Sequence, residues 1–358
     1  MTKKYFLKKS KMENQKTDLI YFLPGMGSTD AEKYFKKLFL ELQELGVAEK
    51  FHAQKLLGRD GEKKIGEICL HDYFRDNLEK FCEKIESEIR AQNLDKNNEI
   101  NFNVILGGHS MGGLFATFLL SEKEKIEKKL AEKFPGKKIN LNFQKVIPIV
   151  PAPLNDPKIL EKNPDSEKSQ KFLDRVIFPR GIKLFGTAIL NSLRANENLD
   201  APTFVYLEKL ITEYICPDEN SAEQKEICEN LGPESVIALF EIALQKFATD
   251  EKTKKKLIRE ITATKNSRNP ILKFLHFSKF LNCLLKNGEK IEIDPEKMND
   301  EKFLFLVTES DAVVNSKITE FLAQQFGAKI EKVDSSHHGM VGQGAEDVAQ
   351  KISKNLEN

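Results

Sequence analysis

Short apolar runs alternate with longer segments of helical periodicity over two parts of the chain. Most of the runs are too short for a helix. They also lack the alternation of apolar and polar residues that a strand with one solvent-exposed face shows, and such continuous apolar runs are typical of parallel strands covered on both faces. Strand candidates lie at 19–23, 51–57, 104–106, 146–150, 303–307 and 329–333, and helix candidates begin near 30 and 114 or cover 71–91, 315–326 and 345–356. This alternation predicts an α/β fold with a mostly parallel sheet flanked by helices.

The alternation stops between residues 154 and 295. Apolar positions there recur at helical spacing, and the segment contains no convincing strand. Helices are expected over 172–194, 202–215, 236–248 and 271–285. The chain is therefore expected to form one core from residues 18–153 and 296–358. A large all-helical cap insertion, 154–295, interrupts this core, and residues 1–17 form a basic, disordered tail.

Composition narrows the class of protein. The 358 residues include 56 basic and 55 acidic ones, so the net charge of +1 creates no field that attracts nucleic acid, and no nucleic-acid partner is expected. The sequence contains no run of 18 apolar residues, so no membrane-spanning helix is expected. The first sixteen residues lack the apolar segment of a signal peptide, and the five cysteines show no metal-binding spacing, so a reduced, cytoplasmic location is expected.

Four glycines surround one serine in the segment 107–113. The strand at 104–106 turns there directly into a helical pattern, and glycines let the two backbones approach closely at such a bend. Gly108-His109-Ser110-Met111-Gly112 fits the G-x-S-x-G nucleophile elbow, in which a strained turn exposes the hydroxyl. Ser110 is therefore the candidate nucleophile.

A serine nucleophile needs a base to take its proton and an acid to orient that base. In folds with this elbow, the acid follows a late strand and the histidine follows the last one. Asp311 and Glu309 both follow the strand at 303–307. Asp311 is favoured because the loop needs some length to carry a carboxylate to the histidine. The last strand is followed by both His337 and His338, and the residues alone leave this pair open.

Acyl transfer also requires two backbone N–H donors for the developing oxyanion. The amide of Met111, directly after the nucleophile, is one candidate. The second is expected from the loop after the first strand, where Gly25 allows a turn that points the Met26 amide inward. This chemistry needs no cofactor and no metal.

With these residues in place, the chain resembles the α/β-hydrolases and, more narrowly, the bacterial lysophospholipases and monoacylglycerol lipases. Gly108–Gly113 matches the G-H-S-M-G-G elbow of that family, and Asp311-Ala312-Val313-Val314 matches its D-x-V-V acid loop. Tyr73–Phe81 is similar to its Tyr-x-x-Asp-Leu-x-x-Phe pattern, with one extra residue before the leucine. The resemblance covers about 18–153 and 296–358.

The resemblance also selects between the two late histidines. Related lipases follow their histidine with x-G-L-L or a similar run, and His337-His338-Gly339-Met340-Val341 fits that register, so His337 is the implied base. Two segments depart from the family. Pro24-Gly25 stands where a His-Gly is usual, and Gly58-Arg59-Asp60-Gly61 stands where a Gly-x-Gly-x-Ser stretch is usual.

The resemblance implies a serine carboxylic-ester hydrolase that works through an acyl-enzyme on a lipid monoester, such as a lysophospholipid or a monoacylglycerol. The alternatives are a small-ester esterase, an acyltransferase, or a non-catalytic protein that binds a lipid or a partner on the same fold. The amphipathic insertion and the basic tail additionally suggest peripheral contact with a membrane. The sequence defines no oligomeric state.

Overall fold

Six parallel strands form the central sheet, in the order β2-β1-β3-β4-β7-β8. The computed structural model describes residues 17–47, 49–152, 203–204, 221–244, 246–289, 302–311, 313–314, 316–338 and 341–356. The strands are β1 (Leu19–Leu23), β2 (Phe51–Ala53), β3 (Glu99–His109), β4 (Lys138–Ile149), β7 (Leu304–Val307) and β8 (Lys329–Lys332). The predicted parallel α/β sheet is thus confirmed.

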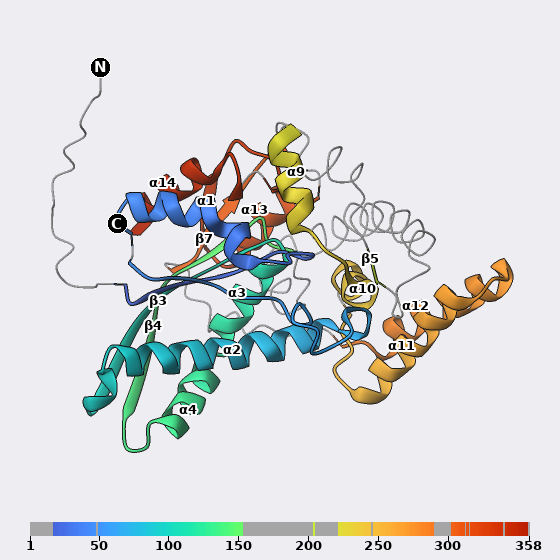
Figure 1. Cartoon of the computed structure of the whole chain (residues 1–358), viewed down its shortest axis with the longest axis horizontal. Helices are drawn as coiled ribbons and strands as arrows, with labels where there is room; N and C mark the ends of the chain where they lie inside the picture. The colour runs from blue at the N-terminus through green and yellow to red at the C-terminus, as the bar shows by residue number, and fades with distance from the viewer. Residues whose placement is uncertain are drawn as a thin grey trace.

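Helices cover both faces of this sheet (Figure 1). One face packs against α1 (Ala31–Glu44) and α14 (Ala345–Leu356). The other face packs against α2 (Leu70–Ala91), α3 (Met111–Ser121), α4 (Lys123–Lys133) and α13 (Ser316–Gln325). Short 3-10 helices, η1 (Ile65–Glu67) and η2 (Leu94–Lys96), flank α2. Successive residues of β1 are all buried but belong alternately to the two core clusters, which explains why the strand is a continuous apolar run.

The two central strands are longer than their apolar runs indicated. β3 has 11 residues and β4 has 12, and they pair in parallel from Glu99 opposite Lys138 to His109 opposite Ile149. Their first halves lie beyond the part of β3 that pairs with β1, and burial alternates there from residue to residue. These half-covered segments alternate apolar and polar residues, so a search for continuous apolar runs finds only the second half of each strand.

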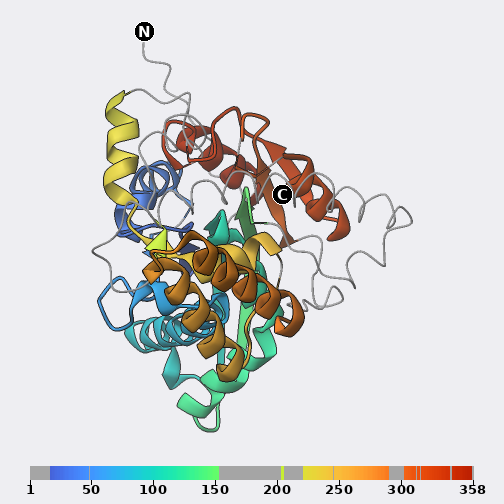
Figure 2. The same ribbon diagram turned by 90° about the vertical axis from the view of Figure 1, so that its right-hand side faces the viewer.

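The described part of the insertion contains four helices and one short strand pair. The helices are α9 (Ser221–Asn230), α10 (Val236–Leu244), α11 (Glu251–Asn266) and α12 (Pro270–Asn287). β5 (Thr203–Phe204) pairs antiparallel with β6 (Glu234–Ser235), at the start of the segment expected to form the helix 202–215. α11 and α12 lie side by side (Figure 2) and project from the body of the molecule (Figure 1).

Several expectations for the insertion and the tail lie outside the described residues. They include the helix at 172–194, most of that at 202–215, and residues 1–16 of the basic tail predicted over 1–17. The domain bounds 154 and 295 remain predictions for the same reason. Within the described ranges, no helix combines the length and the apolar character needed to cross a membrane.

Candidate active site

Ser110 occupies a one-residue turn between β3 and α3. Its backbone has φ +53° and ψ −119°, a region that non-glycine residues rarely adopt. The Ser110 N–H donates to the Ile149 carbonyl at 2.9 Å, and the Ser110 carbonyl accepts from the amides of Gly113 at 3.0 Å and Ala152 at 2.9 Å. Because the neighbouring strand and helix hold the backbone on both sides, the strained conformation is kept.

The glycines around Ser110 allow the sharp bend. A Cβ atom on Gly108 would overlap the backbone of Gly112, and a Cβ atom on Gly112 would overlap the carbonyl of Leu23 at the end of β1. The strand and the helix therefore cross at a distance that only glycine permits. This turn has the backbone form of the nucleophile elbow that the sequence predicted.

Asp311 and His337 meet in the loops after β7 and β8. The Nδ1 of His337 lies 2.6 Å from Oδ2 of Asp311, and both side chains are buried. The other carboxylate oxygen, Oδ1, accepts from the amides of Val313 and Val314, each at 2.7 Å. Since an ionised carboxylate only accepts, Nδ1 carries the proton and Nε2 has the free lone pair of a base.

The two competing residues have different surroundings. Glu309 is exposed and pairs with Lys332 at 2.6 Å, away from the histidines. His338 is buried, but neither of its ring nitrogens has a hydrogen-bond partner in the described structure. Burial also lowers the pKa of His338 well below its usual value, with the neighbouring His337 adding to the effect. Only His337 of this pair therefore contacts a carboxylate.

His109, the residue before the nucleophile, ties the histidine loop to the elbow. Its Nε2 donates to the His337 carbonyl at 2.8 Å, and its Nδ1 lies 2.6 Å from the hydroxyl of Tyr34 in α1. Because a carbonyl only accepts, Nε2 carries the proton, so Nδ1 accepts from the tyrosine. Burial, more than the nearby histidines, lowers the pKa of His109 well below its usual value and keeps the ring neutral.

The three histidines are close enough to be considered as metal ligands. One ring nitrogen from each of His109, His337 and His338 lies within 4.8 Å of the others. However, both nitrogens of His109 already have hydrogen bonds, and Nδ1 of His337 is bonded to Asp311. A metal ion held by all three would have to break at least one bond to His109.

The loop between β1 and α1 passes beside Ser110. A Cβ atom on Gly25 would lie 3.3 Å from the Cβ of Ser110, so a larger residue would crowd the serine. Among the described residues, no hydrogen bond uses the amide of Met26 or of Met111. Met111 is the first residue of α3. The first amides of a helix have no acceptor within the helix, and they form the positive end of the helix dipole. The positive φ of the loop is at Gly27, +81°, rather than at Gly25.

A buried glutamate of the insertion holds this loop, and sequence reasoning missed it. Oε2 of Glu234 accepts from the Gly27 amide at 3.0 Å and from Nη2 of Arg59 at 2.9 Å. Its Oε1 accepts from the Tyr73 hydroxyl at 2.5 Å and from the Ser235 amide at 2.9 Å. The Arg59 and Glu234 side chains are 3% and 0% exposed, so this is a buried ion pair.

Backbone pairing joins the same two segments. The Gly27 carbonyl accepts from the Gly232 amide at 2.7 Å, and Ser28 forms an antiparallel bridge with Leu231. Arg59 belongs to a segment that departs from the lipase pattern, and Tyr73 begins the segment 73–81 that is similar to it, but neither signal points to Glu234. The insertion is thus hydrogen-bonded to the loop that carries Met26.

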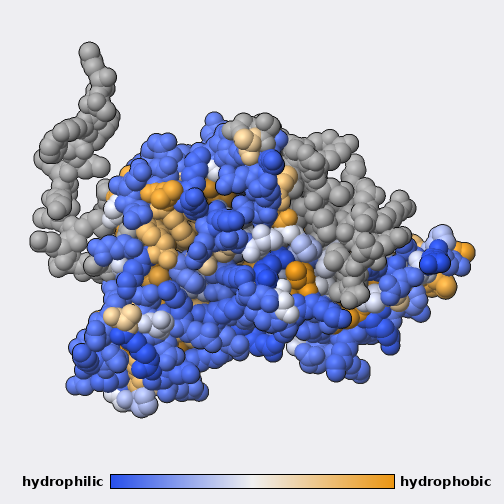
Figure 3. Space-filling model, viewed as in Figure 1, coloured by the Kyte–Doolittle hydropathy of each residue, from blue (hydrophilic) through white to orange (hydrophobic). Residues whose placement is uncertain are grey.

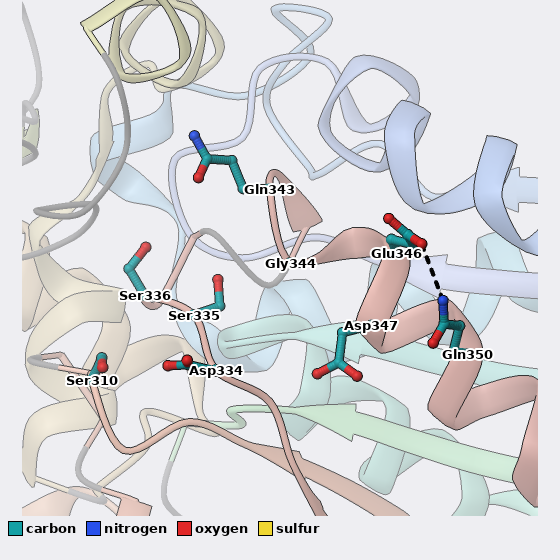
Figure 4. A pocket seen from close by; sticks show the side chains of 9 residues that line it. All are labelled: Ser310, Asp334, Ser335, Ser336, Gln343, Gly344, Glu346, Asp347 and Gln350. Carbon is teal, nitrogen blue, oxygen red and sulfur yellow. Dashed lines mark hydrogen bonds between the residues drawn. The ribbon is translucent and has the colours of Figure 1, made fainter. Parts of the chain in front are cut away.

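A polar pocket of about 680 Å³ lies beside the residues that directly precede His337 (Figure 4). Ser335 and Ser336 line one side, and the first turn of α14 lines the other. Its acidic lining residues are Asp334, Glu346 and Asp347. This lining does not suit an acyl chain, which binds in apolar cavities.

The three candidate site residues follow three strands of the sheet in chain order. Ser110 follows β3, Asp311 follows β7 and His337 follows β8, so all three lie after the carboxyl ends of parallel strands. The chain has an α/β-hydrolase fold.

The chain was also compared with known proteins. No family model and no curated protein matches the sequence. An extracellular α/β-hydrolase from a Paenibacillus species is 14% identical, with 94% of this chain and 98% of that chain covered and a TM-score of 0.45. Polyneuridine aldehyde esterase is 13% identical, with 96% and 100% covered and a TM-score of 0.48. A methylesterase from Arabidopsis is 14% identical, with 94% and 97% covered and a TM-score of 0.46.

Proposed function

We propose that the protein is a serine hydrolase that cleaves carboxylic esters through an acyl-enzyme. The observation that carries this proposal is the buried pair of His337 and Asp311, joined through His109 to the strained turn at Ser110. Ser110 attacks the acyl carbonyl while Nε2 of His337 takes its proton. Asp311 holds the ring in one tautomer and stabilises the positive charge that it acquires.

The remaining steps use the same groups. The amides of Met111 and Met26 donate to the oxyanion of each tetrahedral intermediate, and each such donor supports the rate by about 3 kcal/mol. His337 then gives its proton to the leaving alcohol, and the alcohol departs. Water attacks the acyl-enzyme with His337 again acting as the base, which releases the acid and restores Ser110.

A lipid monoester, such as a lysophospholipid or a monoacylglycerol, is the substrate class within this proposal. Its support is the similarity of the elbow, the acid loop and the histidine segment to those of lysophospholipases and monoacylglycerol lipases. Hydrolysis of short esters and acyl transfer to an alcohol would use the same Ser110 and His337. The test must therefore separate chain length and acceptor as well as activity.

The test compares the parent protein with Ser110→Ala on nitrophenyl esters of increasing chain length, on a lysophosphatidylcholine and on a monoacylglycerol. The parent is expected to prefer long acyl chains, and Ser110→Ala to lose at least about 1,000-fold in kcat. Activity confined to acetate and butyrate would exclude the lipid monoester. Transfer to an added alcohol in preference to water would indicate an acyltransferase, and equal activity of the variant would exclude the reaction at this residue.

A further inference from the structure

The projecting pair α11 and α12 carries a charge unlike that of the rest of the chain. Residues 251–287 contain ten lysines and arginines but only two glutamates, a net charge of +8, whereas the whole chain has +1. The remaining residues are therefore acidic on balance. Both helices project as a hairpin at the right of Figure 1, and Figure 2 shows them in front of the core.

The outer end of this hairpin is apolar. Ile271 and Phe274 are each 72% exposed, Leu272 is 47% exposed and Leu275 is 45% exposed. These four are the majority of the seven large apolar side chains that are exposed in the described structure. They lie in the first turns of α12, next to the turn from α11, and Figure 3 shows apolar atoms at this outer end. The opposite end of α12 is packed instead, with Phe280 and Leu284 buried.

Most cations of the hairpin have no acidic partner among the described residues. Lys254, at the base, forms an ion pair with Asp72 of α2 at 2.5 Å. Arg268, Lys273 and Lys279 have no acidic partner among the described residues. The outer half, or tip, of the hairpin thus combines exposed apolar side chains with Arg268 and Lys273, and Lys279 lies one turn beyond Leu275 on α12. Exposed apolar patches of this kind are typical of interaction surfaces.

We propose that this tip docks on an anionic lipid bilayer. Ile271, Leu272, Phe274 and Leu275 enter the boundary between headgroups and acyl chains, while Arg268, Lys273 and Lys279 contact the anionic headgroups. A helix with basic residues around exposed Phe and Leu side chains is typical of binding at the membrane interface. Each cation near such a surface adds to the attraction.

Two other occupants fit the tip less well. In a symmetric dimer the same patch would face itself, which would bring the two hairpins, each with a charge of +8, together. A nucleic acid would pair with the cations but would leave Ile271 and Phe274 exposed. A lipid surface with negative headgroups satisfies both the charge and the apolar side chains.

Docking needs no ester hydrolysis, so it can succeed or fail independently of the proposed function. It does bear on the geometry of the site, because α10 begins directly after Ser235 and leads into the hairpin. The segment that holds the Gly27 loop is therefore continuous with the segment proposed to meet the membrane.

The experiment measures vesicle co-sedimentation of the full chain with phosphatidylcholine alone and with phosphatidylcholine plus phosphatidylglycerol. We expect at least tenfold tighter binding to the anionic vesicles, and a loss of that difference at high salt because exposed charges are screened. Ile271→Ser together with Phe274→Ser is expected to weaken binding at least tenfold, and Arg268→Glu together with Lys279→Glu to remove the preference for anionic lipid. Leu40→Ser together with Leu45→Ser, at exposed positions of the α1 segment, is the matched control and should bind like the parent.

A second measurement reports on insertion directly. The chain has no tryptophan, so Phe274→Trp supplies a single fluorophore at the tip and Leu40→Trp supplies one at a control position. Anionic vesicles should shift the emission of Phe274→Trp to the blue and leave that of Leu40→Trp unchanged. Equal binding to both kinds of vesicle, or no effect of the tip variants, would overturn the proposal. So would a dimer in light scattering that Ile271→Ser with Phe274→Ser abolishes.

Discussion

Two clusters of buried polar side chains flank the Ser110 turn, and they differ in origin. The histidine cluster, Tyr34, His109, Asp311 and His337, comes entirely from the core, at the ends of its strands and from α1. The glutamate cluster has core residues Arg59 and Tyr73 around Glu234, which belongs to the insertion. The first cluster positions the proposed base, whereas the second positions the loop with one proposed oxyanion donor. The described part of the insertion thus contributes to the proposed site through Glu234.

The clusters also differ in the free energy that a substitution is expected to cost. The histidine cluster contains one carboxylate, and its Oδ1 also accepts from two backbone amides. The glutamate cluster contains a buried ion pair, and loss of one buried partner typically costs about 3 to 5 kcal/mol of folding free energy. Substitutions in the first should therefore change the rate most, and substitutions in the second should change both rate and stability.

The largest effect is expected from the base. His337→Ala removes the proton acceptor for Ser110 and should lower kcat by about 10,000-fold or more, and Asp311→Asn should approach the same loss because it favours the wrong tautomer. Steady-state kinetics of both variants measure the loss of kcat, and their unfolding midpoints show whether the variants remain folded. If His337→Ala kept more than a small fraction of the parent rate while His338→Ala lost it, the roles of the two histidines would be reversed.

Glu234 should give a smaller loss of rate with a larger loss of stability. Glu234→Gln leaves Arg59 with an uncompensated charge and weakens the acceptor for the Gly27 amide, so kcat should fall by about 10- to 100-fold with little change in KM. Glu241→Gln is the matched control, since Glu241 is also a buried glutamate of the insertion but accepts from Leu70 and Ala248 instead of the loop. It should lower stability and leave kcat near the parent value.

A double variant separates positioning from folding. Arg59→Met with Glu234→Leu removes the buried charges together and should recover much of the lost stability. The Gly27 amide still lacks its acceptor, so kcat should stay low. Recovery of kcat along with stability would show that Glu234 acts only on folding.

The smallest effect is expected at His338, whose buried ring nitrogens have no hydrogen-bond partner among the residues that the structure describes. His338→Leu should keep kcat within about threefold and should leave the unfolding free energy unchanged or raise it by roughly 1 kcal/mol. Because burial lowers the pKa of His338, the unfolded chain binds the proton first as pH falls below about 6.5, and folding stability declines. Thermal unfolding across this pH range should show a shallower decline in His338→Leu than in the parent, by at most about 1.4 kcal/mol per pH unit.

Local signals indicated most of the histidine cluster, although the choice of His337 over His338 came from the resemblance. The elbow is contiguous in sequence, and Asp311 and His337 each follow a recognisable strand. The role of His109 was missed, since its partner is the backbone of a residue 228 positions away. That position is nevertheless fixed by the motif, directly before the nucleophile.

The glutamate cluster left no comparable pattern. Glu234 and Gly27 are 207 positions apart, and nothing near Glu234 in sequence marks it as buried. The charged helices α9 and α11 were missed for a related reason, because their apolar residues are too few to form a clear stripe. Such segments are stabilised by contacts with distant parts of the chain, which a local pattern does not contain.

Labelling of the intact protein with a fluorophosphonate, followed by mass mapping of the modified peptide, tests the central claim most directly. The probe reacts only with a serine whose hydroxyl a neighbouring base activates. We predict one adduct, on Ser110, which is absent from Ser110→Ala and forms far more slowly in His337→Ala. An adduct on another residue, or labelling of Ser110→Ala at the parent rate, would contradict the account.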